Sequence, residues 1–136
     1  GDQNLGVISL SVVEQTTPVG TAATGTGTTS PASVTVGSVG ADDLVVDNFA
    51  SNPDNGDPTE GADQTLRNSQ DGAETKLRQS SQVGTAGGVM SWTFSPGGAA
   101  WVLGGIAFKP VAAAAAAAPG HGMLLSGIRN SVIQRV

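Results

Sequence analysis

The sequence has no cysteine and no tyrosine, and its two tryptophans and three phenylalanines make up only 4% of the 136 residues. Without cysteine, neither disulfide bonds nor zinc sites with cysteine ligands can form. With so few aromatic side chains, a binding surface built on aromatic anchors is not expected.

Charge is also scarce: charged residues account for 12% of the chain, about half their usual share, and the net charge is −5. Binding to nucleic acid requires clustered Lys and Arg, so a nucleic-acid partner is not expected, and neither is an anionic membrane. No apolar run approaches the roughly 20 residues of a membrane-spanning helix. Gly1 begins a polar stretch rather than a basic signal-peptide region, and the missing initiator Met is compatible with a processed chain or a fragment.

Glycine is abundant, at 20 of 136 residues, and Thr, Ser, Ala and Val supply most of the remainder. These residue types favour strands and turns. Their pattern predicts an all-β fold, an antiparallel β-sandwich or jelly roll with one core, over residues 1–110. The region 20–31 is predicted as a loop or a weak surface strand. Seven strands are expected, with turn residues between them, at 5–13, 33–39, 44–50, 64–70, 75–83, 89–95 and 99–109.

Alternation along these strands predicts which side chains form the core. The two tryptophans alternate with apolar neighbours, so core packing is favoured over a sugar-binding role for them. Gly104 and Gly105 lie within the last predicted strand, where they indicate a bulge or close sheet packing. The predicted core residues are Ile8, Leu10, Val34, Val36, Leu44, Val46, Met90, Trp92, Phe94, Trp101, Leu103 and Ile106.

An acidic, proline- and glycine-rich segment at 51–63 is predicted as a long surface loop. Carboxylates on a loop are ligands that calcium accepts, but their spacing does not match the twelve-residue EF-hand loop. A solvated turn is therefore favoured, and no metal site is predicted. The carboxylates considered are Asp54, Asp57, Glu60 and Asp63, with Asp42, Asp43 and Asp47 elsewhere in the chain.

No catalytic constellation is predicted, and the chain is expected not to be an enzyme. His121, the one histidine, lies in a Pro-Gly-His-Gly sequence, which is a poor place for a rigidly held catalytic base. A glycosidase would need two carboxylates facing each other, and nothing in the sequence brings Asp47 and Glu74 together. Neither GxGxxG before a helix nor GxxxxGK[ST] occurs, so no nucleotide or other cofactor is expected.

After Pro110 the composition changes abruptly. Residues 111–120 are an alanine-rich linker, and residues 121–136 are an amphipathic tail that is predicted to be helical or strand-like. We expect this tail to dock on a neighbouring subunit, although folding back onto its own sandwich remains an alternative. The predicted docking residues are Met123, Leu124, Leu125, Ile128, Arg129, Val132, Ile133 and Arg135.

Four segments carry a family resemblance: EQTTPVGTAATGTGTTSPASVTV, ADDLVVDNFA, ADQTLRNSQ and GGVMSWTFSPGGAAWVLGGIAFKP. Their order and spacing resemble the second half of a bacterial and phage laminin-G/concanavalin-like jelly-roll domain, over about residues 5–110. The resemblance implies a lectin-like sandwich with no catalytic residues to transfer. Such a domain normally begins several strands earlier, so the core is expected to use fewer strands or to be completed by another chain.

Such domains occur in surface, secreted and phage structural proteins. The sequence thus favours a non-enzymatic structural protein of a repetitive assembly, such as a phage virion decoration or fibre component, located on the virion or outside the cell. Its expected partners are other subunits, either its own copies or capsid and fibre proteins. The alternative is a carbohydrate-binding or adhesive module of a secreted bacterial surface protein, for which glycans would be the partner.

Overall fold

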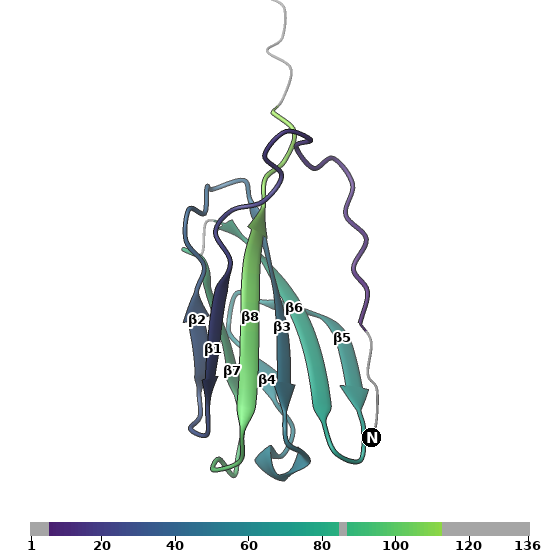
Figure 1. Ribbon diagram of the computed structural model, residues 1–136, viewed down its shortest axis with the longest axis vertical. Coiled ribbons are helices and arrows are strands. Elements are labelled where there is room, and N and C mark those ends of the chain that lie inside the picture. Colours follow the sequence, from purple (N-terminus) through teal and green to yellow (C-terminus); the bar gives the residue numbers. More distant parts are fainter. Residues whose placement is uncertain (1–5, 85–86, 113–136) are drawn as a thin grey trace, which may run out of the picture.

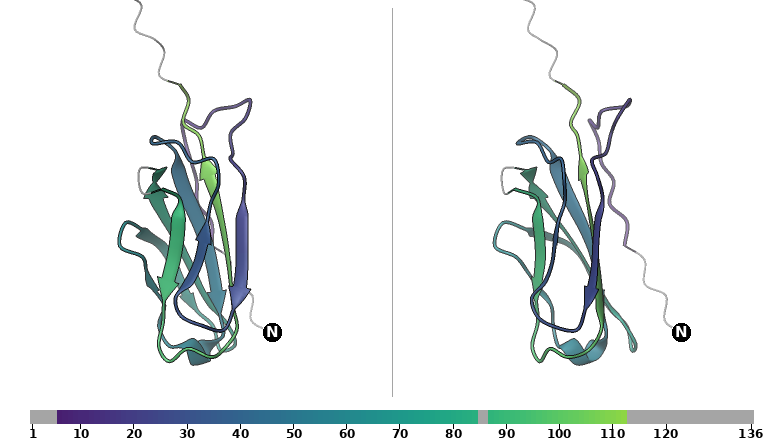
Figure 2. Two further views of the ribbon diagram at one scale, coloured as in Figure 1. Left: turned by 90° about the vertical axis from the view of Figure 1, so that its left-hand side faces the viewer. Right: turned by 60° about the vertical axis from the view of Figure 1, so that its left-hand side comes forward.

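The computed structural model describes residues 6–84 and 87–112, which form two antiparallel sheets packed face to face (Figures 1 and 2). The larger sheet has the order β1-β8-β3-β6-β5, and the smaller has the order β2-β7-β4. The predicted all-β antiparallel sandwich is confirmed. The strands are β1 (Ala23–Gly27), β2 (Ala32–Thr35), β3 (Leu44–Ser51), β4 (Thr59–Glu60), β5 (Thr65–Asp71), β6 (Lys76–Val83), β7 (Val89–Thr93) and β8 (Trp101–Phe108).

Six of the seven predicted strands correspond to β2, β3, β5, β6, β7 and β8, although β2 ends four residues early. The predicted strand at 5–13 is wrong over its described part, because residues 6–10 form no sheet ladder. This segment instead lies against the outer face of the larger sheet, where its side chains rather than its backbone meet the strands. The region 20–31 contains a true strand, β1, at the edge beside β8. The predicted loop at 51–63 contains a short 3-10 helix, Pro53–Asn55, and β4.

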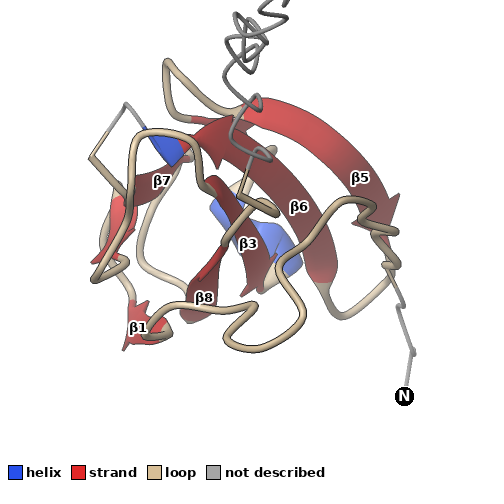
Figure 3. Ribbon diagram, turned by 90° about the horizontal axis from the view of Figure 1, so that it is seen from above, coloured by secondary structure: helices blue, strands red, loops and turns tan. Residues whose placement is uncertain are grey.

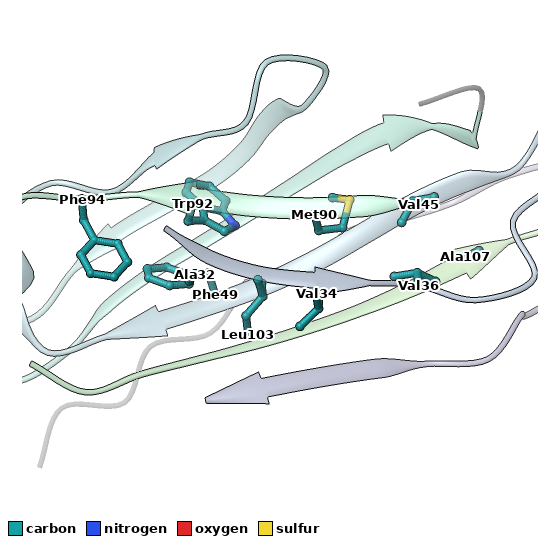
Figure 4. Close-up of a cluster of buried hydrophobic side chains, with 10 residues drawn as sticks. All are labelled: Ala32, Val34, Val36, Val45, Phe49, Met90, Trp92, Phe94, Leu103 and Ala107. Carbon is teal, nitrogen blue, oxygen red and sulfur yellow. The ribbon is translucent and has the colours of Figure 1, made fainter. Parts of the chain in front are cut away.

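The apolar core lies between the sheets and is drawn in Figure 4. At one end, the ring of Phe49 stacks on Trp92 at a centroid distance of 5.5 Å and contacts Phe94 at 5.9 Å. The other end is aliphatic, so the core tapers from large to small side chains along the strands. Its members are Ala32, Val34, Val36, Val45, Phe49, Met90, Trp92, Phe94, Leu103 and Ala107. The predictions for Val34, Val36, Met90, Trp92, Phe94 and Leu103 are confirmed.

The other core predictions need correction. Leu44, Val46 and Ile106 lie on the outer face of the larger sheet and are half-buried, because the inward residues of β3 are Val45, Asp47, Phe49 and Ser51. In a run of consecutive aliphatic residues, alternation does not show which residues face inward. The charged Asp47 among the inward residues of β3 makes the opposite, incorrect assignment look better. Ile8 and Leu10 are half-buried outside the core. Trp101 is also half-buried; it packs at the core margin and donates Nε1–H to the Thr29 carbonyl at 2.9 Å.

The Gly104-Gly105 pair reflects close sheet packing rather than a bulge. The pairing of β8 with β3 runs without interruption from Trp101 to Phe108. At Gly105, which faces inward, a Cβ atom would stand 2.8 Å from Cγ2 of Val36, the residue after β2, and 3.6 Å from Cγ2 of Val34 within β2. Glycine therefore lets β2 approach β8 closely, while Gly104 faces the outer surface and has no close neighbour.

Candidate functional site

An extended segment, residues 6–10, crosses the outer face of the larger sheet, on the side opposite to β2 and β7 (Figures 2 and 3). Gln79 Nε2 donates a hydrogen bond to the Gly6 carbonyl at 3.3 Å. Ile8 and Leu10 turn partly inward, whereas Val7 between them is exposed. The alternation that predicts a strand here instead places two aliphatic side chains against the sheet.

The upper end of this segment is tied to the chain that follows β8. Val111 N donates to the Val12 carbonyl at 2.9 Å, and Glu14 N donates to the Lys109 carbonyl at 3.0 Å. Val12 has a φ of 60°, a strained conformation for a β-branched residue. The chain therefore turns sharply at Val12, beside the point where residues after β8 leave the sheet.

Glu14 stabilises the turn that follows. Its carboxylate accepts hydrogen bonds from the backbone N–H groups of Thr16 and Thr17. These bonds favour the charged form and lower the pKa of Glu14 to about 2. Glu14 is therefore a fixed negative charge at the upper end of the larger sheet at any physiological pH.

Between segment 6–10 and the strands β1, β8 and β3 there is an apolar hollow of about 390 Å³, here called the outer groove. Its floor is the outward face of β3 and β8, and one of its sides is formed by Ile8 and Leu10. The polar side chains along it are few. The lining residues are Ile8, Leu10, Ala22, Ala23, Thr24, Val46, Asp47, Asn48, Gln79, Gly104, Gly105, Ile106 and Phe108.

The volume of the outer groove falls within the range of roughly 300–1,000 Å³ that is usual for ligand sites. A smaller hollow of about 150 Å³ shares Leu10 and Phe108 with it and reaches Val12, Val13 and Pro110. The apolar surface therefore continues toward the place where the described chain passes Val111. Aliphatic walls without converging polar groups suit aliphatic side chains or another apolar chain rather than a charged or strongly polar ligand.

Asp47 is buried between the sheets, with 2% of its surface exposed, and its carboxylate accepts four hydrogen bonds. Oδ2 accepts from Trp92 Nε1 at 2.7 Å and from Gln64 Nε2 at 3.2 Å. Oδ1 accepts from the backbone N and the Oγ of Ser80 at 2.7 and 2.8 Å. The orientation of the Gln64 amide is fixed by a further bond, because its Oε1 accepts from Ser91 N at 2.7 Å and a reversed amide would lose that hydrogen bond. The carboxylate thus joins both sheets.

Burial raises the pKa of the Asp47 carboxyl, and the hydrogen bonds from Ser80, Trp92 and Gln64 oppose that rise. Glu74, the other carboxylate considered for hydrolysis, lies on the exposed connection between β5 and β6. The two groups do not share a hollow. Asp47 is enclosed by its donors, so the arrangement supports a structural role for this residue.

The raised pKa gives a testable pH dependence. At pH values between the pKa of Asp47 in the unfolded chain and its higher pKa in the folded protein, the folded protein holds a proton that the unfolded chain has released. The contribution of Asp47 to the free energy of unfolding is therefore largest below about pH 4 and falls as the pH rises through the folded pKa. We expect the difference in unfolding free energy between wild type and Asp47→Asn to shrink from about pH 4 to pH 7. Urea unfolding across this pH range measures the difference. The lowered pKa values of Asp57 and Glu14 affect both proteins equally and therefore cancel from it. A difference that grows with pH would contradict the raised pKa.

The acidic residues of 51–63 do not converge. Asp57 forms an ion pair with Lys76, whose hydrogen bond and charge lower the pKa of the Asp57 carboxyl. Within residues 6–84 and 87–112, no group of three or more His, Cys, Asp or Glu side chains is arranged to hold a metal ion. His121 and the eight predicted docking residues lie outside the described residues. The same described part has no helix long and apolar enough to cross a membrane.

The outer groove was missed by sequence reasoning, although a signal for it exists. Leu44, Val46, Ile106 and Phe108 form an aliphatic and aromatic stripe on the outward faces of adjacent strands. Had Val45 and Phe49 been taken as the inward residues of β3, their neighbours would have been predicted on a second apolar face. Such a face on an antiparallel sheet needs a cover.

No family model, curated protein or solved structure matches the chain. The resemblance to laminin-G/concanavalin-like jelly rolls therefore stays a prediction.

Proposed function

We propose that the chain is a non-enzymatic structural protein of a repetitive assembly, acting through contacts between subunits as a phage virion decoration or fibre component would. The observation that carries the proposal is the outer groove: an apolar hollow on an exposed sheet face, only partly covered by segment 6–10. Apolar surface of this kind favours association with another protein. Its location would then be the virion or the outside of the cell.

The tail is the second support. Residues 121–136 carry Leu124, Leu125, Ile128, Val132 and Ile133 but no acidic residue. Burying five aliphatic side chains contributes on the order of 8–15 kcal/mol in gross transfer free energy, before ordering costs. The chain therefore carries both an apolar groove and an apolar segment, the two surfaces that a contact between subunits would need.

The alternative is a carbohydrate-binding or adhesive module of a secreted bacterial surface protein. Sugar sites use aromatic faces together with several polar groups that fix the hydroxyls. Phe108 is the aromatic residue among those that line the outer groove, and the other walls are mostly aliphatic. The groove therefore supports a protein contact better than a glycan contact.

Deleting residues 119–136 is expected to abolish assembly while leaving the sandwich folded, because the core that the described residues form between the sheets extends no further than Ala107. Native mass spectrometry gives the assembly state, and circular dichroism gives the melting temperature. Global unfolding of the shortened chain would show that the tail patches its own domain. Unchanged assembly would refute the proposal, and a stable monomer of the full chain that binds a glycan array would establish the alternative.

A further inference from the structure

We propose that the outer groove is the receptor for the tail, residues 123–136, of a second copy of this chain. This inference rests on the proposed function and deepens it, because it names the two surfaces that meet. The tail is chosen as the occupant for three reasons, which concern apolar fit, charge and the position from which the tail departs.

The first reason is fit. The floor of the groove follows β8 from Gly104 to Phe108, a length of about 13 Å at the usual rise of a strand. As a helix, the stretch from Leu124 to Val132 would span about 12 Å and would place Leu124, Leu125, Ile128 and Val132 along one side. An apolar stripe of matching length and an apolar floor are complementary. This is the helix-in-groove mode of recognition, in which aliphatic anchors repeat every three to four residues.

The second reason is charge. Residues 1–112 contain four Lys and Arg against eleven Asp and Glu, a net charge of −7, whereas Arg129 and Arg135 give the rest of the chain +2. The upper end of the groove has two acidic neighbours. The backbone N–H of Glu14 donates to the Lys109 carbonyl, next to Phe108. Asp42 lies two residues before Leu44, and Leu44 pairs with Phe108. Lys109 is the basic residue at this end. A basic apolar tail is therefore attracted to an acidic domain bearing an apolar hollow.

The third reason is position. β8 runs along the groove and the chain continues beyond its upper end to Val111, where Val111 N is bonded to the Val12 carbonyl. The described chain thus leaves the upper end of its own groove, and a segment continuing in that direction would have to reverse to enter the same groove. The linker 112–120 can extend to about 30 Å, which is enough to reach a neighbouring subunit. Docking between copies makes every subunit both donor and receptor.

Filling the groove tests the receptor. A side chain at Gly104 would point into the hollow, and a Cβ atom there meets nothing closer than 4.0 Å, so Gly104→Leu should fold and occupy the floor. Thr26→Leu is the matched control, because Thr26 is exposed on the same face of the sheet but does not line the groove. Ala22→Glu, which places a charge at the exposed lip, is a second variant in case Gly104→Leu fails to fold. In the full chain, both groove variants should weaken self-association at least about tenfold in sedimentation, and Thr26→Leu should not.

Mixing tests the direction of docking. A chain with Leu124→Asp and Leu125→Asp keeps its groove but loses its tail, whereas Gly104→Leu keeps its tail but loses its groove. Each should be monomeric alone, and an equimolar mixture should give a heterodimer by native mass spectrometry, since one intact tail meets one intact groove. No heterodimer in the mixture would overturn docking between copies and indicate that the tail binds its own groove.

The outcomes also separate this inference from the proposed function. If the tail variant loses assembly while Gly104→Leu and Ala22→Glu assemble normally, the tail mediates assembly elsewhere and the groove assignment is wrong. If the unmodified full chain is monomeric at all concentrations tested, both the inference and the proposed function fail.

Discussion

Replacing Trp92 with alanine is expected to lower the free energy of unfolding by about 3–5 kcal/mol. The ring is fully buried, stacks on Phe49 and contributes the largest side chain of the core. Its loss leaves a cavity between the sheets and also removes the donor to Asp47 Oδ2. Chemical denaturation followed by far-UV circular dichroism measures the change.

The two contributions of Trp92 can be separated. Trp92→Phe keeps most of the ring and its stacking but removes one of the four hydrogen bonds to the Asp47 carboxylate, so it should cost about 1–3 kcal/mol, the usual range for a hydrogen bond to a charged group. Trp101→Phe is a useful comparison, because Trp101 is half-buried and its Nε1 bonds to an exposed carbonyl. A Trp92→Ala variant with an unchanged unfolding free energy would show that the ring is not in the core.

Replacing Asp47 with asparagine is expected to lower the free energy of unfolding by about 2–4 kcal/mol near neutral pH, despite the near-identical shape of the side chain. The carboxylate accepts from donors on both oxygens, whereas the asparagine amide offers one acceptor and one NH₂ group. The NH₂ group would face either Ser80 or the pair formed by Trp92 and Gln64. Two of the four hydrogen bonds to this side chain are thus lost in either orientation.

Asn48→Ser is the matched control, since Asn48 is the exposed neighbour of Asp47 on the same strand and should change stability by less than about 0.5 kcal/mol. Denaturant midpoints of the three proteins give the comparison. Equal stability of wild type and Asp47→Asn near neutral pH would mean that desolvation of the charge offsets its hydrogen bonds completely.

The sequence predicts the sandwich well where alternation is clean. In β7 and the residue after it, Met90, Trp92 and Phe94 alternate with polar residues and are all buried. It fails at β1, whose ATGTG sequence has no apolar alternation. This strand is stabilised by pairing with β8, and its small residues are required by the neighbouring ring: a Cβ at Gly27 would stand 2.8 Å from Trp101 Cζ2. That constraint comes from a residue 74 positions away and leaves no local signal.

The outer groove was hidden for a different reason. Its parts come from segment 6–10, β1, β3 and β8, which the fold brings together from both ends of the described chain. Ile8 and Leu10 alternate as a strand would, but their segment lies over the outer face of the larger sheet and has no strand pairing. Periodicity indicates which side chains share a side but not which of two sheet faces receives them.

The buried carboxylate of Asp47 has a consequence for misfolding. A slip of β3 by one residue against β6 and β8 would turn Asp47 outward and bring Val46 or Asn48 into its place. The run Leu44-Val45-Val46 would tolerate that slip, because an aliphatic side chain would face inward in either register. The slipped form would, however, leave the buried indole N–H of Trp92 without its acceptor and would leave the Gln64 amide with Ser80 Oγ alone. The register of β3 is therefore selected by its one charged residue, Asp47, more than by its hydrophobic residues.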